Sequence, residues 1–169
     1  WGGEASRTQY GIDLQAQGAR WRATGGSTGT NYGRASVTLR AAIPLVPRIW
    51  RLGMEAGVGT TWGDAPPQRQ WFMGGATTLR GYRASSVGGS SFARGRVEVA
   101  RTFDEIGSLT AFGDIAWAGL RGDFNGDDLL YGIGVGASLL DGLVRFDVSQ
   151  GLTGPTKQFR VDLYLDAPF

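Results

Sequence analysis

The sequence is organised around residues Gln70–Arg83, which read QWFMGGATTLRGYR. They lie within residues 63–91, the longest segment that lacks the alternating pattern of a β-strand. A connection of this length in a compact domain is usually functional or disordered. Large apolar side chains argue against disorder; they are Trp71, Phe72, Met73, Leu79 and Tyr82. We therefore expect this long loop to pack against the rest of the protein.

Short runs of alternating apolar and polar residues flank the loop on both sides, as in strands that have one apolar face. We expect Pro44–Pro47 to end the second strand, because proline cannot continue a hydrogen-bonded ladder. Asp141–Gly142 is a two-residue hairpin signal. The chain is thus predicted to be all-β and antiparallel. Its eight strands are expected at about residues 8–21, 33–43, 49–62, 92–103, 109–118, 129–140, 143–149 and 157–167.

Two regularities favour a transmembrane β-barrel over a soluble one. The connections alternate between short and long, as they do in membrane barrels. Charges and glycines keep to one face of each run, which suits a wet lumen, and the apolar face suits lipid. The runs have roughly 10–14 residues, against about 9–11 for a tilted strand that crosses a bilayer.

Composition excludes several classes of function. The chain has 169 residues, with 17 Lys and Arg against 15 Asp and Glu, so a nucleic-acid-binding patch is not indicated. It has no His and no Cys, which removes the commonest general base and thiol chemistry. The sequence contains no run of 18 apolar residues, so it predicts no transmembrane helix. We expect no enzyme activity, cofactor or metal. The start at Trp1 does not look natural, so we expect an upstream part.

Three motifs resemble chemical sites but are better explained by structure. Gly132–Ala137 fits G-x-G-x-x-A, but it lies inside an alternating strand rather than at a strand-to-helix turn. Asp123–Asp128 begins like a calcium loop but lacks the sixth-position Gly and the twelfth-position Glu. Glu98 and Asp114 could form a hydrolytic carboxylate pair, but no signal for a substrate cleft accompanies them. Pairing with arginine is therefore preferred.

The loop resembles the signature of the outer-membrane protein assembly and secretion barrel superfamily, which includes BamA, TamA and the transporters of two-partner secretion. That family has a sixteen-stranded barrel, whose long sixth loop folds into the lumen with a V/L-R-G-F/Y tip. Five strands follow the loop in the family, as in the prediction here. The resemblance therefore covers the whole chain as the last eight strands. The loop residues that carry it are Gly74, Gly75, Leu79, Arg80, Gly81 and Tyr82.

Two further motifs of the family match strands that follow the loop. The G-x-x-E motif corresponds to Gly95–Glu98, and F-x-D-x-G to Phe112–Ala116, with alanine in place of the last glycine. The resemblance implies that Arg80 pairs with Glu98 and Asp114. Strand alternation places both acids on the lumenal face of neighbouring strands, and a guanidinium can satisfy two carboxylates. The alternative is that these acids pair with strand neighbours such as Arg94 and Arg96.

The C-terminus resembles the recognition signal by which outer-membrane barrels are delivered for insertion. This signal consists of a terminal aromatic residue preceded by alternating apolar residues, here Phe159, Val161, Leu163, Leu165 and Phe169.

The resemblance implies a barrel of the bacterial outer membrane that inserts or translocates polypeptides, with a lumenal loop anchored by Arg80. Its partners would be outer-membrane lipid and client polypeptides. A seam between the first and last strands would offer edges to a client. A passive pore, a membrane anchor for an associated soluble domain and a soluble binding barrel are the alternatives.

The number of strands constrains the assembly. A closed eight-stranded barrel has an interior just wide enough for its own side chains, so residues 63–91 could not fold into it. An open sheet leaves two unpaired edges, which lipid does not tolerate. We favour a fragment of a sixteen-stranded barrel, or two copies joined through residues 8–21 and 157–169. A closed monomer with the loop outside is the third arrangement. An even strand count places both chain ends on the short-turn, periplasmic side.

Overall fold

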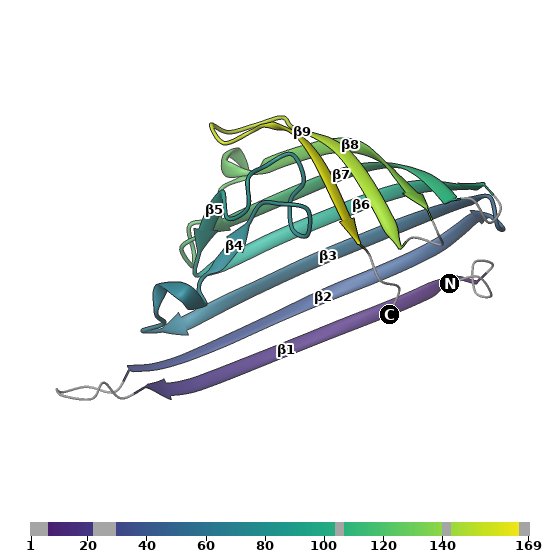
Figure 1. Ribbon diagram of the computed structural model, residues 1–169. Coiled ribbons are helices and arrows are strands. Elements are labelled where there is room, and N and C mark those ends of the chain that lie inside the picture. The colour runs from purple at the N-terminus through teal and green to yellow at the C-terminus, as the bar shows by residue number, and fades with distance from the viewer. Residues whose placement is uncertain (1–6, 22–29, 104–106, 140–142, 166–169) are drawn as a thin grey trace.

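The computed structural model describes residues 7–21, 30–103, 107–139 and 143–165. These residues form one large sheet of eight strands and a small two-stranded sheet (Figure 1). The large sheet contains β1 (Gln9–Trp21), β2 (Thr30–Val46), β3 (Trp50–Gly63), β6 (Ser91–Phe103), β7 (Gly107–Gly119), β8 (Leu130–Leu139), β9 (Val144–Gly151) and β10 (Phe159–Leu165).

The strands of the large sheet follow one another in chain order, and every neighbouring pair is antiparallel. This confirms the predicted all-β class and the eight antiparallel strands. Among the described residues the sheet is not closed into a barrel, because β1 pairs only with β2 and β10 pairs only with β9. No helix in the described ranges is long and apolar enough to cross a membrane.

The two faces of the large sheet differ sharply in chemistry. We call the outer face the one that contains the paired row Ile12–Leu39–Ala56–Gly95–Ile115–Tyr131. The inner face contains the paired row Arg40–Glu55–Arg96–Asp114–Gly132–Gly151. A two-residue side-chain period keeps these sets apart along every strand.

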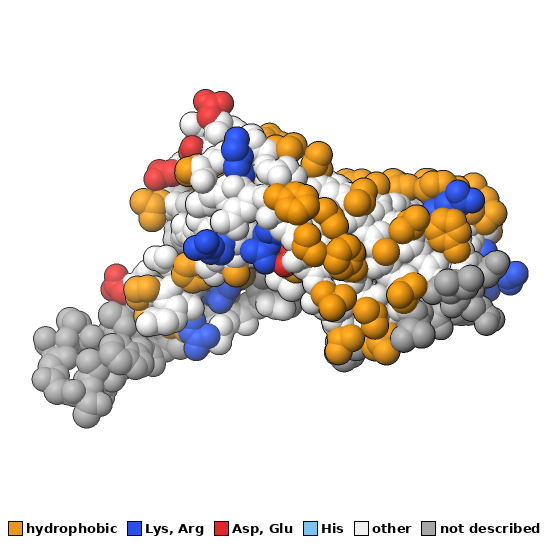
Figure 2. Space-filling view, turned by 45° about the horizontal axis from the view of Figure 1, so that its top comes forward, with side chains coloured by type: hydrophobic (Ala, Val, Ile, Leu, Met, Phe, Trp, Pro, Cys, Tyr) orange, Lys and Arg blue, Asp and Glu red, His pale blue; other side chains and the backbone are white. Residues whose placement is uncertain are grey.

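The outer face is apolar and exposed. Ile12 is 69% exposed, Val58 51%, Val135 59% and Leu163 71%, although each lies within a strand. Figure 2 shows hydrophobic side chains spread over this surface. A sheet in water usually buries its apolar face and wets its polar face, so the arrangement here is inverted.

The long connection between β3 and β6 contains secondary structure, which corrects the expectation of an unstructured loop over residues 63–91. It holds a 3₁₀ turn, η1 (Pro67–Arg69), and a hairpin of β4 (Trp71–Met73) and β5 (Val87–Gly89). Each of these strands has three residues, which is too short for alternation to predict. The hairpin lies over the inner face of the sheet (Figure 1).

β2 ends at Val46, directly before Pro47, so the segment Pro44–Pro47 does contain the end of the strand. The expected end at residue 43 was wrong, because Pro44 lies within β2. Pro44 pairs with Arg51 of β3, and the register shifts only between Pro44 and Val46. The ladder with β1 ends at Gln9 and Ala42. Pro44 therefore has a partner on one side only, which is the position in which a strand tolerates proline.

The other boundaries differ by a few residues. A second 3₁₀ turn, η2 (Gly126–Asp128), lies between β7 and β8. β9 continues to Gly151, and β10 begins at Phe159 rather than at residue 157. Lys157 instead forms an isolated bridge with Tyr82 of the long loop. The predicted Asp141–Gly142 turn and Phe169 lie outside the described residues.

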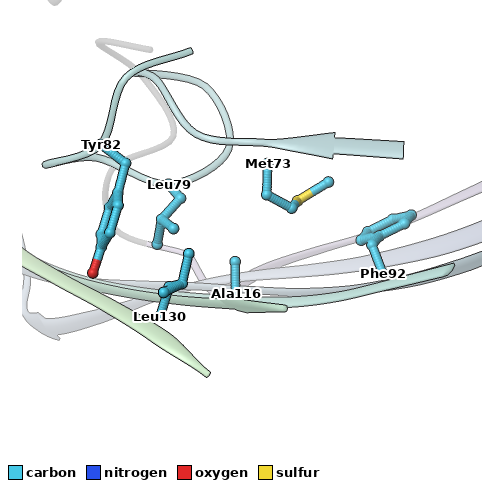
Figure 3. Close-up of a cluster of buried hydrophobic side chains, with 6 residues drawn as sticks. All are labelled: Met73, Leu79, Tyr82, Phe92, Ala116 and Leu130. Atoms are coloured by element: carbon cyan, nitrogen blue, oxygen red, sulfur yellow. The ribbon is translucent and has the colours of Figure 1, made fainter. Parts of the chain in front are cut away.

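The apolar core lies between the loop and the inner face, not between two sheets. Figure 3 shows Met73, Leu79 and Tyr82 of the loop pointing towards the sheet. They meet three buried side chains of β6, β7 and β8, which are Phe92, Ala116 and Leu130. The loop thus supplies three of the six residues in the buried apolar cluster that is found among the described residues. Its apolar side chains cover part of the polar inner face.

Candidate functional site

The site is built on the segment Gly74–Tyr82, which closes on itself before it meets the sheet. Gly74 and Gly75 have φ values of +124° and +88°, in a region that favours glycine. The amide of Gly75 donates to the Tyr82 carbonyl at 3.1 Å, and the Leu79 amide donates to the Gly75 carbonyl at 3.1 Å. The Thr78 hydroxyl accepts from the Gly74 amide and donates to its carbonyl, at 2.8 Å each. The backbone therefore presents residues 79–82 as a fixed tip.

Tyr82 fastens one side of the tip to β8 and to the connection between β9 and β10. It is fully buried, and its hydroxyl oxygen lies 2.8 Å from the carbonyl oxygens of Tyr131 and Thr153. The hydroxyl also accepts from the amide of Thr153 at 3.2 Å. The Gly81 carbonyl accepts from the Gln158 amide at 2.9 Å. Gly81 has a φ of +83°, and a Cβ there would meet the backbone of Gln150 and Gly151.

Arg80 fastens the centre of the tip through its guanidinium group, which is 1% exposed. Nε and Nη2 donate to the two carboxylate oxygens of Asp114 at 2.8 and 2.7 Å. Nη1 donates to Oε1 of Glu98 at 2.6 Å. The backbone amide of Arg80 also donates to Asp114, at 3.0 Å. The guanidinium carbon lies 3.4 Å from the centre of the Phe112 ring, a cation–π contact.

The structure thus brings Arg80 into contact with both carboxylates that the sequence analysis assigned to it, and with Phe112 of the supporting motif. Burial alone would lower the pKa of the guanidinium, and the hydrogen bonds and charges of Asp114 and Glu98 raise it above its ordinary value. Arg80 is therefore held in its charged form. The Asp114 carboxylate also accepts from Arg96 at 3.1 Å, so pairing with a strand neighbour occurs alongside the pairing with Arg80.

Three members of the network were not named by the sequence analysis. Asp147 of β9 is fully buried and lies 3.5 Å from Nη1 of Arg80. Arg145 bridges Glu98 and Asp147 at 3.0 Å each. The Tyr164 hydroxyl of β10 donates to Asp147 at 2.7 Å. The register of β9 places Arg145 and Asp147 on the inner face, but nothing in the loop motif pointed to β9 as a partner.

The network is balanced in charge, because Arg80, Arg96 and Arg145 face Glu98, Asp114 and Asp147. It links β6, β7, β9 and β10 to the loop. A second row on the same face joins Asp13, Arg40, Glu55 and Arg94 across β1, β2, β3 and β6. The carboxylates are engaged by arginines, so the arrangement is suited to holding the loop in place.

Glycines of β8 create the space that this network occupies. A Cβ on Gly132 would collide with the Arg80 carbonyl, one on Gly134 would lie 2.5 Å from the Phe112 ring, and one on Gly136 would collide with the Asp147 carboxylate. This explains the repeat in Gly132–Ala137 without a nucleotide. The inner face of β8 must be flat where the loop, the aromatic ring and the acid approach it.

The remaining predicted residues lie away from this network. Gly95 belongs to the outer face, where a Cβ would lie 3.0 Å from the side chain of Ile115. The alternating residues of the predicted insertion signal lie on the outer face of the edge strand β10. They are 66, 54, 71 and 74% exposed for Phe159, Val161, Leu163 and Leu165, respectively.

Arg34 attaches the base of the hairpin, a contact that the sequence analysis missed. Its guanidinium stacks on the Trp71 ring at 3.4 Å, and Trp71 packs on Phe92 with ring centres 4.5 Å apart. Arg94 and Arg96 also donate to the loop carbonyls of Thr77 and Ala76, at 3.4 and 3.3 Å. Comparison with protein-family models and with curated proteins gives no match for this chain.

We expect Arg80→Ala to release the loop, because it leaves Asp114 buried without its principal counter-ion. Loss of one partner of a buried ion pair costs about 3–5 kcal/mol. The measurement is hydrogen exchange at the amides of residues 74–83, which should speed up while the amides of β6 and β7 stay protected. Arg121→Ala, at an exposed loop residue, is the control. Equal exchange of residues 74–83 in both variants would contradict the anchoring role.

We expect Gly132→Ala to weaken loop docking, because the new methyl group would overlap the Arg80 carbonyl. Forced overlap in a packed site costs about 1–3 kcal/mol. Gly126→Ala is the matched control, since a Cβ there meets nothing within 4 Å. The midpoint of denaturant unfolding should fall for Gly132→Ala alone. Similar midpoints for the two variants would show that the close approach of loop and β8 is not required.

Proposed function

We propose that the chain belongs to a bacterial outer-membrane barrel that inserts or translocates polypeptides, with the loop tip held in the lumen by Arg80. The observation that carries the proposal is the inverted sheet. Its exposed outer face is apolar, while its inner face carries a buried ion-pair network under a docked loop. Lipid is the solvent that suits the first face, and a protected interior suits the second.

The loop supports a wide interior. The hairpin and the tip cover the inner face of β6, β7 and β8 and contact residues as far as Lys157. A closed eight-stranded barrel has room for side chains only. The open sheet with its docked loop therefore supports a barrel with more strands than these eight, either from further chain or from a second copy.

The edges support a role in handling polypeptides. In the described part of the chain, β1 and β10 each have one neighbouring strand, so each forms an edge of the sheet. An exposed edge is a template for adding another strand. On both edges the outward residues are apolar and the inward residues polar, so an added amphipathic strand would continue both faces. A client strand or the edge of a second copy meets this requirement.

We expect the outer face to be shielded by lipid. The chain has no cysteine, so Val97→Cys and Arg121→Cys each introduce a single thiol. Val97 is 49% exposed on the outer face, and Arg121 lies in an exposed loop. In phospholipid vesicles, a water-soluble maleimide should label position 121 at least tenfold faster than position 97. Rapid labelling at both positions, together with solubility without detergent, would indicate a soluble binding barrel instead.

We expect the edge strands β1 and β10 to pair with each other across two copies, or with a client strand. Oxidation of Ile12→Cys with Leu163→Cys, both on the outer face, should give a disulfide, whereas Ile12→Cys with Asp162→Cys should not, because Asp162 faces inward. A link between two chains indicates the two-copy barrel, and a link within one chain indicates a closed monomer.

A cross-link from either cysteine position to a newly made outer-membrane polypeptide supports insertion. No client link together with steady conductance would contradict insertion and indicate a passive pore.

A further inference from the structure

Arg101 breaks the separation of charge between the two faces. On the strands whose side chains are described, the other charged residues lie on the inner face, as Arg94, Arg96 and Glu98 do on the same strand. Arg101 lies on the outer face, where it pairs with Trp50 of β3 and Leu109 of β7. It is therefore the one described charge on the outer face of the strands, whose other side chains are mostly apolar.

Aromatic and aliphatic side chains surround Arg101. Its guanidinium carbon lies 4.9 Å from the Phe103 ring centre and 5.8 Å from that of Trp50, within the range of cation–π attraction. Trp50, Phe103 and Leu109 are 39, 38 and 55% exposed. Arg101 forms no salt bridge with a carboxylate in the described part of the chain. Asp104 and Glu105 lie outside the described residues.

Arg101 also lies close to one end of β6. It stands two residues before the end of the strand, beside the short β2–β3 turn that contains exposed Arg48. Figure 2 shows Lys and Arg side chains towards both ends of the apolar surface. A charge on the lipid face of a barrel is costly at the midplane and nearly free at the interface. Aromatic belts mark the same level.

We propose that Arg101, with Trp50 and Phe103, binds the headgroup of an anionic phospholipid at the short-turn rim of the sheet. This inference rests on the proposed membrane setting and adds a ligand class and a site to it. A guanidinium offers two parallel donors to phosphate oxygens, and it remains charged at any physiological pH. The rings would lie beside the upper acyl chain and glycerol, where their apolar bodies and polar edges are both satisfied.

The test uses the full chain in detergent, titrated with phosphatidylglycerol or phosphatidylcholine of the same acyl chains. Bound lipid is counted by native mass spectrometry. One basic residue near an anionic surface corresponds to about a fivefold preference. We expect the wild type to retain phosphatidylglycerol about fivefold more than phosphatidylcholine. Arg101→Gln should lose that preference and keep its phosphatidylcholine binding, which shows that the variant is folded.

Arg160→Gln is the matched control, because it removes an arginine from the inner face of β10. It should keep the preference. An unchanged preference in Arg101→Gln, or an equal loss in Arg160→Gln, would overturn the lipid site. Inorganic phosphate at the same concentration should not compete, and full competition would assign the site to a free anion instead. If position 97 is shielded in vesicles but Arg101→Gln has no effect, this inference alone fails. Rapid labelling at position 97 would refute both proposals.

Discussion

The bidentate pair between Arg80 and Asp114 is the interaction on which the rest of the structure depends. Both side chains are almost completely removed from solvent, and neither charge would be tolerated there alone. The pair is favourable only because donors and acceptors match, with Glu98 taking the third guanidinium nitrogen. Water must also be kept out, and the loop that carries Arg80 does this with Leu79 and Tyr82. The ion pair and its cover are therefore contributed by the same segment.

Each residue of the tip has a separate physical task. Leu79 packs in the apolar cluster, and Arg80 binds the acids of β6 and β7. Gly81 takes up a positive φ where a side chain would meet β9, and its carbonyl reaches Gln158. Tyr82 carries a polar group through an apolar layer to the carbonyls of Tyr131 and Thr153. A change of any one of these residue types would leave a different defect in the same small contact surface.

Alternation in the sequence predicted the strands and their faces well, because the side-chain period of a strand is fixed by backbone geometry. Glu98 and Asp114 were found because the loop motif and strand parity agree on them. Asp147 was missed since its approach to Arg80 depends on how the sheet curves, which parity does not encode. The hairpin of Trp71–Met73 and Val87–Gly89 was missed because it is too short for a period. The position of Pro44 within β2 was not predicted, because a strand tolerates proline there only if β1 ends before reaching it.

The glycines of β8 leave room on the inner face for the docked loop and its ion pairs. Gly132, Gly134 and Gly136 have no side chains, so the inner face can accept a loop, a ring and a carboxylate. Their outward neighbours Ile133 and Val135 are 50 and 59% exposed. The inner face of β8 is therefore packed by the loop and by neighbouring side chains, while its outer face stays exposed. In the proposed membrane setting, the loop fills one side of this strand and lipid covers the other. In the same proposed setting, the edge strands β1 and β10 need further partners, because backbone groups in lipid must be paired. Whatever pairs with them must alternate as these edges do, with apolar residues outward and polar residues towards the loop.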